Sequence, residues 1–290
     1  MTARDPLAAI RARLAEVTAC WQAPSRWRRS APASPTTWPR WGRAARRWPA
    51  PGPTPGAGAG RRLDRPGCAA RAVLPWRRFP DRGIASHASL IARLAEAGQA
   101  RILAVEYRLA PEHRYPAAID DAFAAYQWLL ANGGAPAAII GDSAGGALAL
   151  QTAQRARDAG LPLPRSLVLL SPWLDLSMQG RSYVELAEQD IFSKPAQLRA
   201  MARSYLGHLG PPPASPLWDD LSGLPPIVVH AGAHDITLDD SHTLAARVRA
   251  AGGQVQLQVF PGMCHHFQIY EALAEAQESI DALGRHLRQD

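Results

Sequence analysis

A serine lies at the centre of a glycine-rich motif, Gly141-Asp142-Ser143-Ala144-Gly145-Gly146, in the middle of the chain. Apolar residues precede the motif and a helix-forming stretch follows it, which places the serine at a strand-to-helix turn. Such a turn exposes the hydroxyl above the edge of a sheet, and glycines two positions before and after the serine avoid clashes across it. Ser143 is therefore the candidate nucleophile of an acyl transfer. The alternative is a turn that only packs, or that cradles a phosphate.

The start of the helix after Ser143 offers a second chemical group. The first N–H groups of a helix have no acceptor within the helix. The N–H of Ala144 can therefore donate to the negative oxygen of a tetrahedral intermediate, and we expect it to be one oxyanion donor.

A serine hydroxyl needs a base, and the base needs an acid that orients it. Asp235 and His265 each follow an apolar strand, and they occur in the chain order serine, acid, histidine. Asp239 and Asp240 could instead cap the helix that follows them. Strand-end position alone leaves four neighbours as alternatives, which are His234, Asp239, Asp240 and His266.

From Gly83 onward, strands and helices alternate, which predicts a mostly parallel sheet with helices on both faces. We expect strands at 101–107, 137–140, 166–170, 227–229 and 255–260, and helices at 89–97, 117–130, 144–159, 238–251 and 272–287.

The N-terminal quarter has a different composition. Residues 21–62 contain no Val, Ile, Leu, Met, Phe or Tyr and are rich in Arg, Pro and Trp. Residues 21–82 hold 14 Arg against two acids, a net +12, which leaves −5 for the rest of a chain whose total is +7. Such a stretch buries too little aliphatic surface to offset the entropy of ordering it. Composition and patterning therefore divide the chain into residues 1–20, an irregular segment at 21–82 and a regularly patterned domain at 83–290.

Several motifs together resemble the bacterial hormone-sensitive-lipase-like carboxylesterases. They are Tyr107–His113 (YRLAPEH), Gly141–Gly146, Ser171-Pro172-Trp173, Ser215–Leu217, Leu221–Pro226, Asp235 ahead of Leu238–Asp240, and Pro261–Met263 followed by His265. The likeness covers residues 83–290 almost without gaps.

The resemblance implies an α/β-hydrolase catalytic domain at 83–290 with a small helical cap, part of it an insertion near 186–213 and a remnant of its N-terminal helix at 1–20. It implies hydrolysis of carboxylic esters with short to medium acyl chains through an acyl-enzyme, without a cofactor. Asp235 and His265 then complete a triad with Ser143, while Arg108, Glu112 and Asp142 are structural.

The chain departs from this family at one motif. Such esterases carry His-Gly-Gly-Gly, whose glycine N–H groups complete the oxyanion hole, where this chain has residues 74–83. Codons that encode residues 74–83 can be chosen so that, moved by one base, they read Cys-His-Gly-Gly-Gly-Phe-Leu-Ile-Gly. The hypothesis is that residues 18–82 are an out-of-frame translation, which leaves the first strands missing or disrupted. The alternative function is an impaired or ligand-binding member of the same fold.

Other classes of function fit the sequence less well. Cys264, His265 and His266 are adjacent and cannot easily surround one tetrahedral ion, so we expect no metal. An Arg- and Trp-rich nucleic-acid binder at 21–82 matches no recognised module, so we expect no nucleic-acid partner. No segment has the ~20 apolar residues of a membrane span. The first seventeen residues lack a signal-peptide pattern and the three cysteines are widely spaced, which favours the cytoplasm. A homodimer is compatible with these features.

Overall fold

The computed structural model of the chain describes residues 70–74, 84–207 and 215–288. All of them belong to one of the two units into which the chain divides, Arg47–Asp290. The predictions for residues 1–69, 75–83 and 208–214 lie outside the described residues. They include the cap remnant, most of the out-of-frame segment and the end of the predicted cap insertion.

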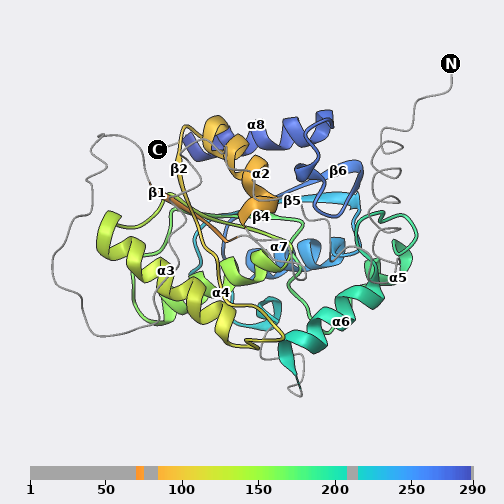
Figure 1. Ribbon diagram of the computed structural model, residues 1–290, viewed down its shortest axis with the longest axis horizontal. Coiled ribbons are helices and arrows are strands. Elements are labelled where there is room, and N and C mark those ends of the chain that lie inside the picture. Colours follow the sequence, from red (N-terminus) through yellow and green to blue (C-terminus); the bar gives the residue numbers. More distant parts are fainter. Residues whose placement is uncertain (1–69, 75–83, 208–214, 289–290) are drawn as a thin grey trace, which may run out of the picture. The chain divides into compact units, whose positions relative to one another are not determined.

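Six parallel strands form one sheet in the described part of the chain (Figure 1). The neighbours across the sheet are, in order, β2, β1, β3, β4, β5 and β6, and each neighbouring pair is parallel. Their bounds are β1 Ala70–Leu74, β2 Arg101–Ala104, β3 Ala138–Asp142, β4 Ser166–Leu170, β5 Ile227–His234 and β6 Val255–Cys264.

Helices cover both faces of this sheet, as the alternation predicted. Their bounds are α2 Ile84–Ala97, α3 Ala117–Gly133, α4 Ala144–Asp158, α5 Ser182–Glu185, α6 Pro195–Leu206, α7 Leu238–Ala250 and α8 Ala274–Arg288, with single 3-10 turns η4 Pro216–Trp218 and η5 Phe267–Ile269.

The period of two along each strand divides the core into two layers. Leu167 and Leu169 of β4 lie in the layer that α3, α4 and α7 cover, whereas Val168 and Leu170 lie in the layer under α2 and α8. Figure 1 shows the same division, with α2 and α8 on one side of the strands and α3 and α4 on the other. Burial on both faces explains why β4 is continuously apolar.

Strand β1 lies inside the segment 21–82 that the composition marked as irregular. Its backbone pairs with β2 on one side and with β3 on the other. The short stretch Ala70–Leu74 lacks the alternation of apolar and polar residues that would predict a strand. Its pairing on both sides is a tertiary effect that single-sequence periodicity does not register.

Between β4 and β5 the chain leaves the sheet and forms α5 and α6 (Figure 1). An apolar cluster joins α6 to the loop after β4, and it contains Trp173, Leu198 and Leu206. The same cluster includes Ile236, which follows the candidate acid Asp235. The region predicted as part of a cap thus packs on the loop that carries that acid.

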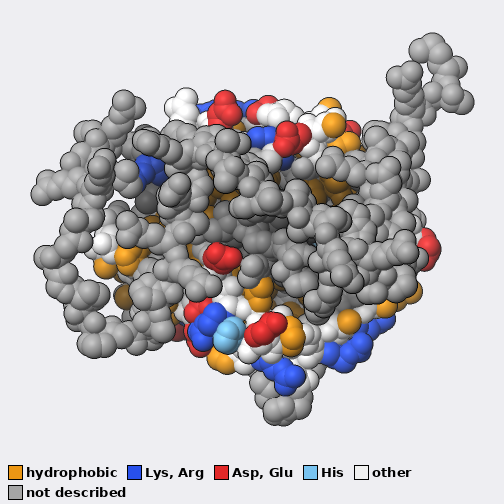
Figure 2. Space-filling view, viewed as in Figure 1, with side chains coloured by type: hydrophobic (Ala, Val, Ile, Leu, Met, Phe, Trp, Pro, Cys, Tyr) orange, Lys and Arg blue, Asp and Glu red, His pale blue; other side chains and the backbone are white. Residues whose placement is uncertain are grey.

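Charges of both signs lie close together on the described surface. On the face that Figure 2 shows, Lys and Arg side chains lie beside Asp and Glu side chains. Arg108 pairs with Asp121 and Arg155 pairs with Asp120, each at 2.8 Å. These two arginines therefore neutralise neighbouring carboxylates.

Candidate active site

The three predicted site residues each come directly after a strand of the same sheet. Ser143 follows β3, Asp235 follows β5 and His265 follows β6. Parallel strands end at one edge of the sheet, so this placement brings residues far apart in the sequence to a common edge. All three side chains are buried.

Ser143 occupies a strained turn between β3 and α4. Its φ of 51° and ψ of −122° lie outside the regions that side-chain-bearing residues ordinarily adopt. Its N–H donates to the carbonyl of Leu170 at 2.9 Å, and its own carbonyl accepts from Gly146 at 2.9 Å. A Cβ on Gly141 would lie 2.2 Å from the carbonyl oxygen of Gly145, so only glycine fits there.

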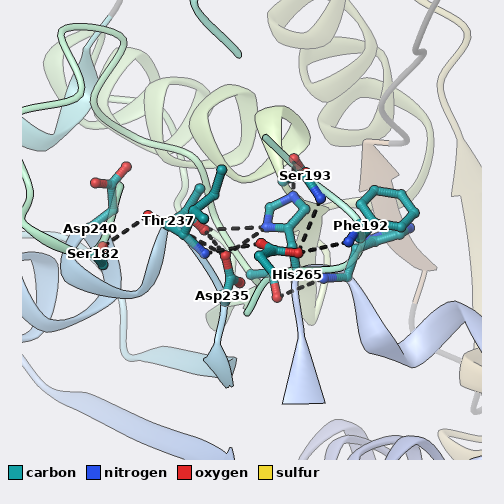
Figure 3. Close-up of polar contacts among 12 residues, drawn as sticks. Ser182, Phe192, Ser193, Asp235, Thr237, Asp240 and His265 are labelled. Carbon is teal, nitrogen blue, oxygen red and sulfur yellow. Dashed lines mark hydrogen bonds and ion pairs between the residues drawn. The ribbon is translucent and has the colours of Figure 1, made fainter. Parts of the chain in front are cut away.

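His265 links the serine to the acid. Its Nε2 lies 2.8 Å from Oγ of Ser143, and its Nδ1 lies 2.9 Å from Oδ1 of Asp235. Figure 3 shows the imidazole of His265 beside Asp235 and Thr237. With Nδ1–H donating to the carboxylate, Nε2 is the free acceptor for the serine proton. The structure therefore brings together the three residues that the sequence predicted, in a hydrogen-bonded chain.

Thr237 is a fourth member of this hydrogen-bonded group, and the sequence analysis did not identify it. Both its backbone N–H, at 2.7 Å, and its hydroxyl, at 2.8 Å, donate to Oδ1 of Asp235. Burial raises the pKa of Asp235, but the charge and hydrogen bond of His265 and the bonds from Thr237 outweigh burial and lower it. Asp235 is thereby held as the carboxylate.

The electrostatic surroundings of His265 favour its protonated form. Burial lowers the pKa of His265, but the charge and hydrogen bond of Asp235 outweigh it, and the pKa is raised above its ordinary value. The charges of Asp190 and Asp142 act in the same direction. A base of this kind can hold a proton briefly and return it.

The rival His266 points to a different partner. Its Nδ1 lies 3.0 Å from Oδ2 of Asp142, and Nε2 of His87 lies 3.2 Å from the same oxygen. Burial opposes ionisation of Asp142, but the charges of His266 and His87 hold its pKa far below the ordinary range. His266 therefore belongs with His87 to a buried polar group around Asp142.

The other alternative site residues, Asp239, Asp240 and His234, do not take part in the hydrogen-bonded chain from Ser143 to Asp235. Asp240 accepts hydrogen bonds from the backbone of Leu174 and Asp175 and from the hydroxyl of Tyr183. Asp239 accepts from the backbone N–H of Ser182, so it ties α7 to α5 rather than capping its own helix. His234 lies at the end of β5 and is half-buried.

Two groups of side chains in the described residues have the composition of metal ligands. They are His87, Asp142 and His266, and Asp190, Asp235 and His265, and within each group one ligand atom per residue lies within 4.8 Å of the others. Polar contacts join the members of the first group and the pair of Asp235 and His265, and backbone N–H groups hold Asp190 beside that pair, so we assign no metal to either group. Cys264 is buried, and burial raises the pKa of its thiol strongly, which disfavours a thiolate nucleophile.

The oxyanion donors are only partly within the described residues. Ala144 opens helix α4 beside Ser143, where its N–H was expected. The position that corresponds to the His-Gly-Gly-Gly motif falls within 75–83, outside the described residues.

A family model described as an alpha/beta hydrolase fold matches residues 81–269. An acetyl-hydrolase of Streptomyces hygroscopicus is 40% identical over 208 residues, which cover 70% of each chain. A crystal structure of an esterase from the bacterial hormone-sensitive lipase family is 37% identical, with a TM-score of 0.73 over 77% of this chain and 78% of that one. The chain belongs to this α/β-hydrolase family of hormone-sensitive-lipase-like esterases.

A further family relative is a carboxylesterase of Mycobacterium tuberculosis, 35% identical over 71% of this chain and 67% of that protein. Another related structure, 38% identical with a TM-score of 0.73, is a family esterase crystal soaked with p-nitrophenyl butyrate, and the match covers 77% of this chain and 78% of that one. Among the described residues, no helix combines the length and apolar character needed to cross a membrane.

Proposed function

We propose that this esterase hydrolyses carboxylic esters of short to medium acyl chain length through an acyl-enzyme on Ser143. The observation that carries the proposal is the continuous hydrogen-bonded chain from Ser143 through His265 to Asp235. The names of the relatives, acetyl-hydrolase and carboxylesterase, support ester bonds as the substrate class.

In the first half of the reaction, Oγ of Ser143 attacks the carbonyl carbon of the ester while its proton passes to Nε2 of His265. The imidazolium that forms is stabilised by the carboxylate of Asp235. The carbonyl oxygen becomes negative and accepts the N–H of Ala144. The bond to the alcohol oxygen then breaks, and His265 returns its proton to the leaving alkoxide.

In the second half, water replaces the alcohol. The oxygen of the water attacks the acyl carbon while His265 removes one proton from the water. The tetrahedral intermediate then collapses and releases Oγ of Ser143, which takes that proton from His265. The products are a carboxylic acid and the restored enzyme. Every proton transfer uses Nε2 of His265, the nitrogen that the structure directs at Oγ.

The same observation favours an enzyme over a ligand-binding relative. The strained backbone of Ser143 costs free energy of about 1–3 kcal/mol, which a protein retains where strain serves function. A pure binding site would not require a buried Asp–His pair aligned on that hydroxyl.

The test is a hydrolysis assay with p-nitrophenyl esters from acetate to dodecanoate. We expect the largest kcat/KM among the short and medium esters and at least a 10⁴-fold lower kcat in Ser143→Ala. Hydrolysis by Ser143→Ala at the rate of the unaltered chain would contradict the proposal.

A further inference from the structure

Asp190 lies between α5 and α6, and its carboxylate is completely buried. One oxygen accepts the backbone N–H groups of Phe192 at 2.9 Å and Ser193 at 3.0 Å. The other oxygen accepts the backbone N–H of Ile236 at 3.0 Å. Because Ile236 follows Asp235, a single carboxylate ties the segment before α6 to the loop of the proposed acid.

The same carboxylate lies close to the proposed base. Carboxylate oxygens of Asp190 and Asp235 and a ring nitrogen of His265 all lie within 4.8 Å of one another. Two buried carboxylates therefore face one imidazole. Burial and the charge of Asp235 raise the pKa of Asp190, while the charge of His265 and the backbone hydrogen bonds act in the opposite direction and oppose part of that rise.

The segment that Asp190 fixes also contacts the base directly. The ring centroid of Phe192 lies 5.8 Å from that of His265 and 5.6 Å from that of His266. Figure 3 shows Phe192 and Ser193 beside His265, on the side away from Thr237. Asp190 thus holds an apolar ring against the imidazole as well as a charge beside it.

The charged and titratable groups that face His265 come from four segments of the chain. They are Asp235 after β5, Asp190 before α6, Asp142 at the end of β3, and His266 on its own loop. The three carboxylates raise the pKa of His265 against burial. Burial lowers the pKa of His266, so His266 adds little positive charge. Burial and the charge of Asp235 raise the pKa of Asp190.

We propose that Asp190 is a positioning residue of the ester hydrolysis, which holds the Asp235 loop and the Phe192 ring in place and sets a second negative charge beside His265. This inference rests on the proposed function, because it assumes that His265 is the base. A charge in this position stabilises the imidazolium that forms in both halves of the reaction.

The experiment measures kcat/KM against pH for p-nitrophenyl butyrate with the full chain and four variants. Asp190→Asn removes the charge, Asp190→Glu keeps the charge with altered geometry, and Asp190→Ser removes the charge with a smaller side chain. Phe192→Leu is the matched control, because it changes the ring but keeps the N–H donor and the carboxylate. Circular dichroism and thermal unfolding report whether each variant folds.

We expect the acidic limb of the profile to move to lower pH in Asp190→Asn and Asp190→Ser, because the imidazolium loses a stabilising charge. We expect the acidic limb to keep its unaltered position in Asp190→Glu and Phe192→Leu. We expect kcat to fall about tenfold or more in the three Asp190 variants, since the acid loop shifts.

An acidic limb at the unaltered position in folded Asp190→Asn or Asp190→Ser would overturn the inference. Failure of every Asp190 variant to fold would also overturn it, because the carboxylate would then serve the fold alone. Ser143→Ala, assayed in parallel, separates the two claims: its retained activity would contradict the proposed function, whatever the Asp190 variants show.

Discussion

Asp142 directly precedes Ser143, and His266 directly follows His265. These two neighbours contact each other, just as Ser143 and His265 do. Oδ2 of Asp142 lies 3.0 Å from Nδ1 of His266, while Oγ of Ser143 lies 2.8 Å from Nε2 of His265. The turn after β3 and the loop after β6 are thus joined twice. The contact between Ser143 and His265 forms one link, and the buried contact between Asp142 and His266 forms the other.

This double link predicts unequal effects of alanine at the two histidines. We expect His265→Ala to lower kcat by about 10⁴-fold or more, because the base is lost. We expect His266→Ala to lower kcat far less but to lower the unfolding temperature, since it leaves Asp142 buried with one partner fewer. Ester assays and thermal unfolding of both variants check this. A larger loss of kcat in His266→Ala would reverse the assignment.

A second prediction concerns pH. His265 must be neutral to accept a proton, and its pKa is raised above the ordinary 6.5. Activity should therefore fall as pH decreases through that raised pKa, and the midpoint of the acidic limb of kcat/KM should lie above pH 6.5. A pH profile with p-nitrophenyl acetate, corrected for spontaneous hydrolysis, measures it.

The control for that profile is His266→Gln. Burial lowers the pKa of His266, so its titration should not shape the acidic limb, and the variant should keep the midpoint. A midpoint below 6.5 in the unaltered chain, or one that moves with His266→Gln, would show that another group controls activity.

The turn at Ser143 supplies a third prediction. In Gly141→Ala the new methyl group meets the carbonyl of Gly145, so the turn must shift and carry Ser143 with it. We expect kcat to fall by about 10²-fold. Gly160→Ala is the control, because Gly160 lies two residues beyond α4 with a φ of +63°, where an added Cβ would meet no other atom within 4 Å. That change should lower stability by about 1 kcal/mol and leave kcat unaltered.

Most of the sheet could be predicted from local patterns in the sequence, whereas the choice of the acid and the histidine needed the family resemblance. The apolar run at 166–170 is the strand β4 as expected, and the helices expected at 117–130 and 238–251 occur as α3 and α7. The motif Gly141–Gly146 predicted Ser143 as the nucleophile, and the family resemblance selected Asp235 and His265 from their neighbours. The structure adds the distances that link them.

Other features depend on contacts between distant parts of the chain. Asp190 and Ile236 are 46 positions apart, and His87 and Asp142 are 55 apart, so no spacing rule connects them. Thr237 was within reach of the sequence, since a Thr two residues after an acid commonly bonds back to it. Strand β1 could not be predicted from the sequence, because its pairing with β2 and β3, rather than its own residue pattern, makes it a strand.

A fourth prediction concerns residues 18–82. If they are an out-of-frame translation, restoring the alternate frame supplies the glycine N–H donors that accompany Ala144 in the family. Loss of one such donor costs about 10²–10³ in turnover, so the restored chain should be faster by at least that factor. Side-by-side expression and ester assays test it, with resequencing of the gene near codons 18 and 83. Equal activity of the two chains would show that the segment is native.

The central claim is that Ser143 forms a covalent acyl-enzyme, and labelling tests it most directly. The chain is treated with an organophosphate, which traps an activated serine, and the modified peptide is located by mass spectrometry. We expect one phosphorylated residue, Ser143, with labelling lost in Ser143→Ala and strongly slowed in His265→Ala. Labelling of Ser143→Ala at another residue of the site, with ester hydrolysis retained, would contradict the account.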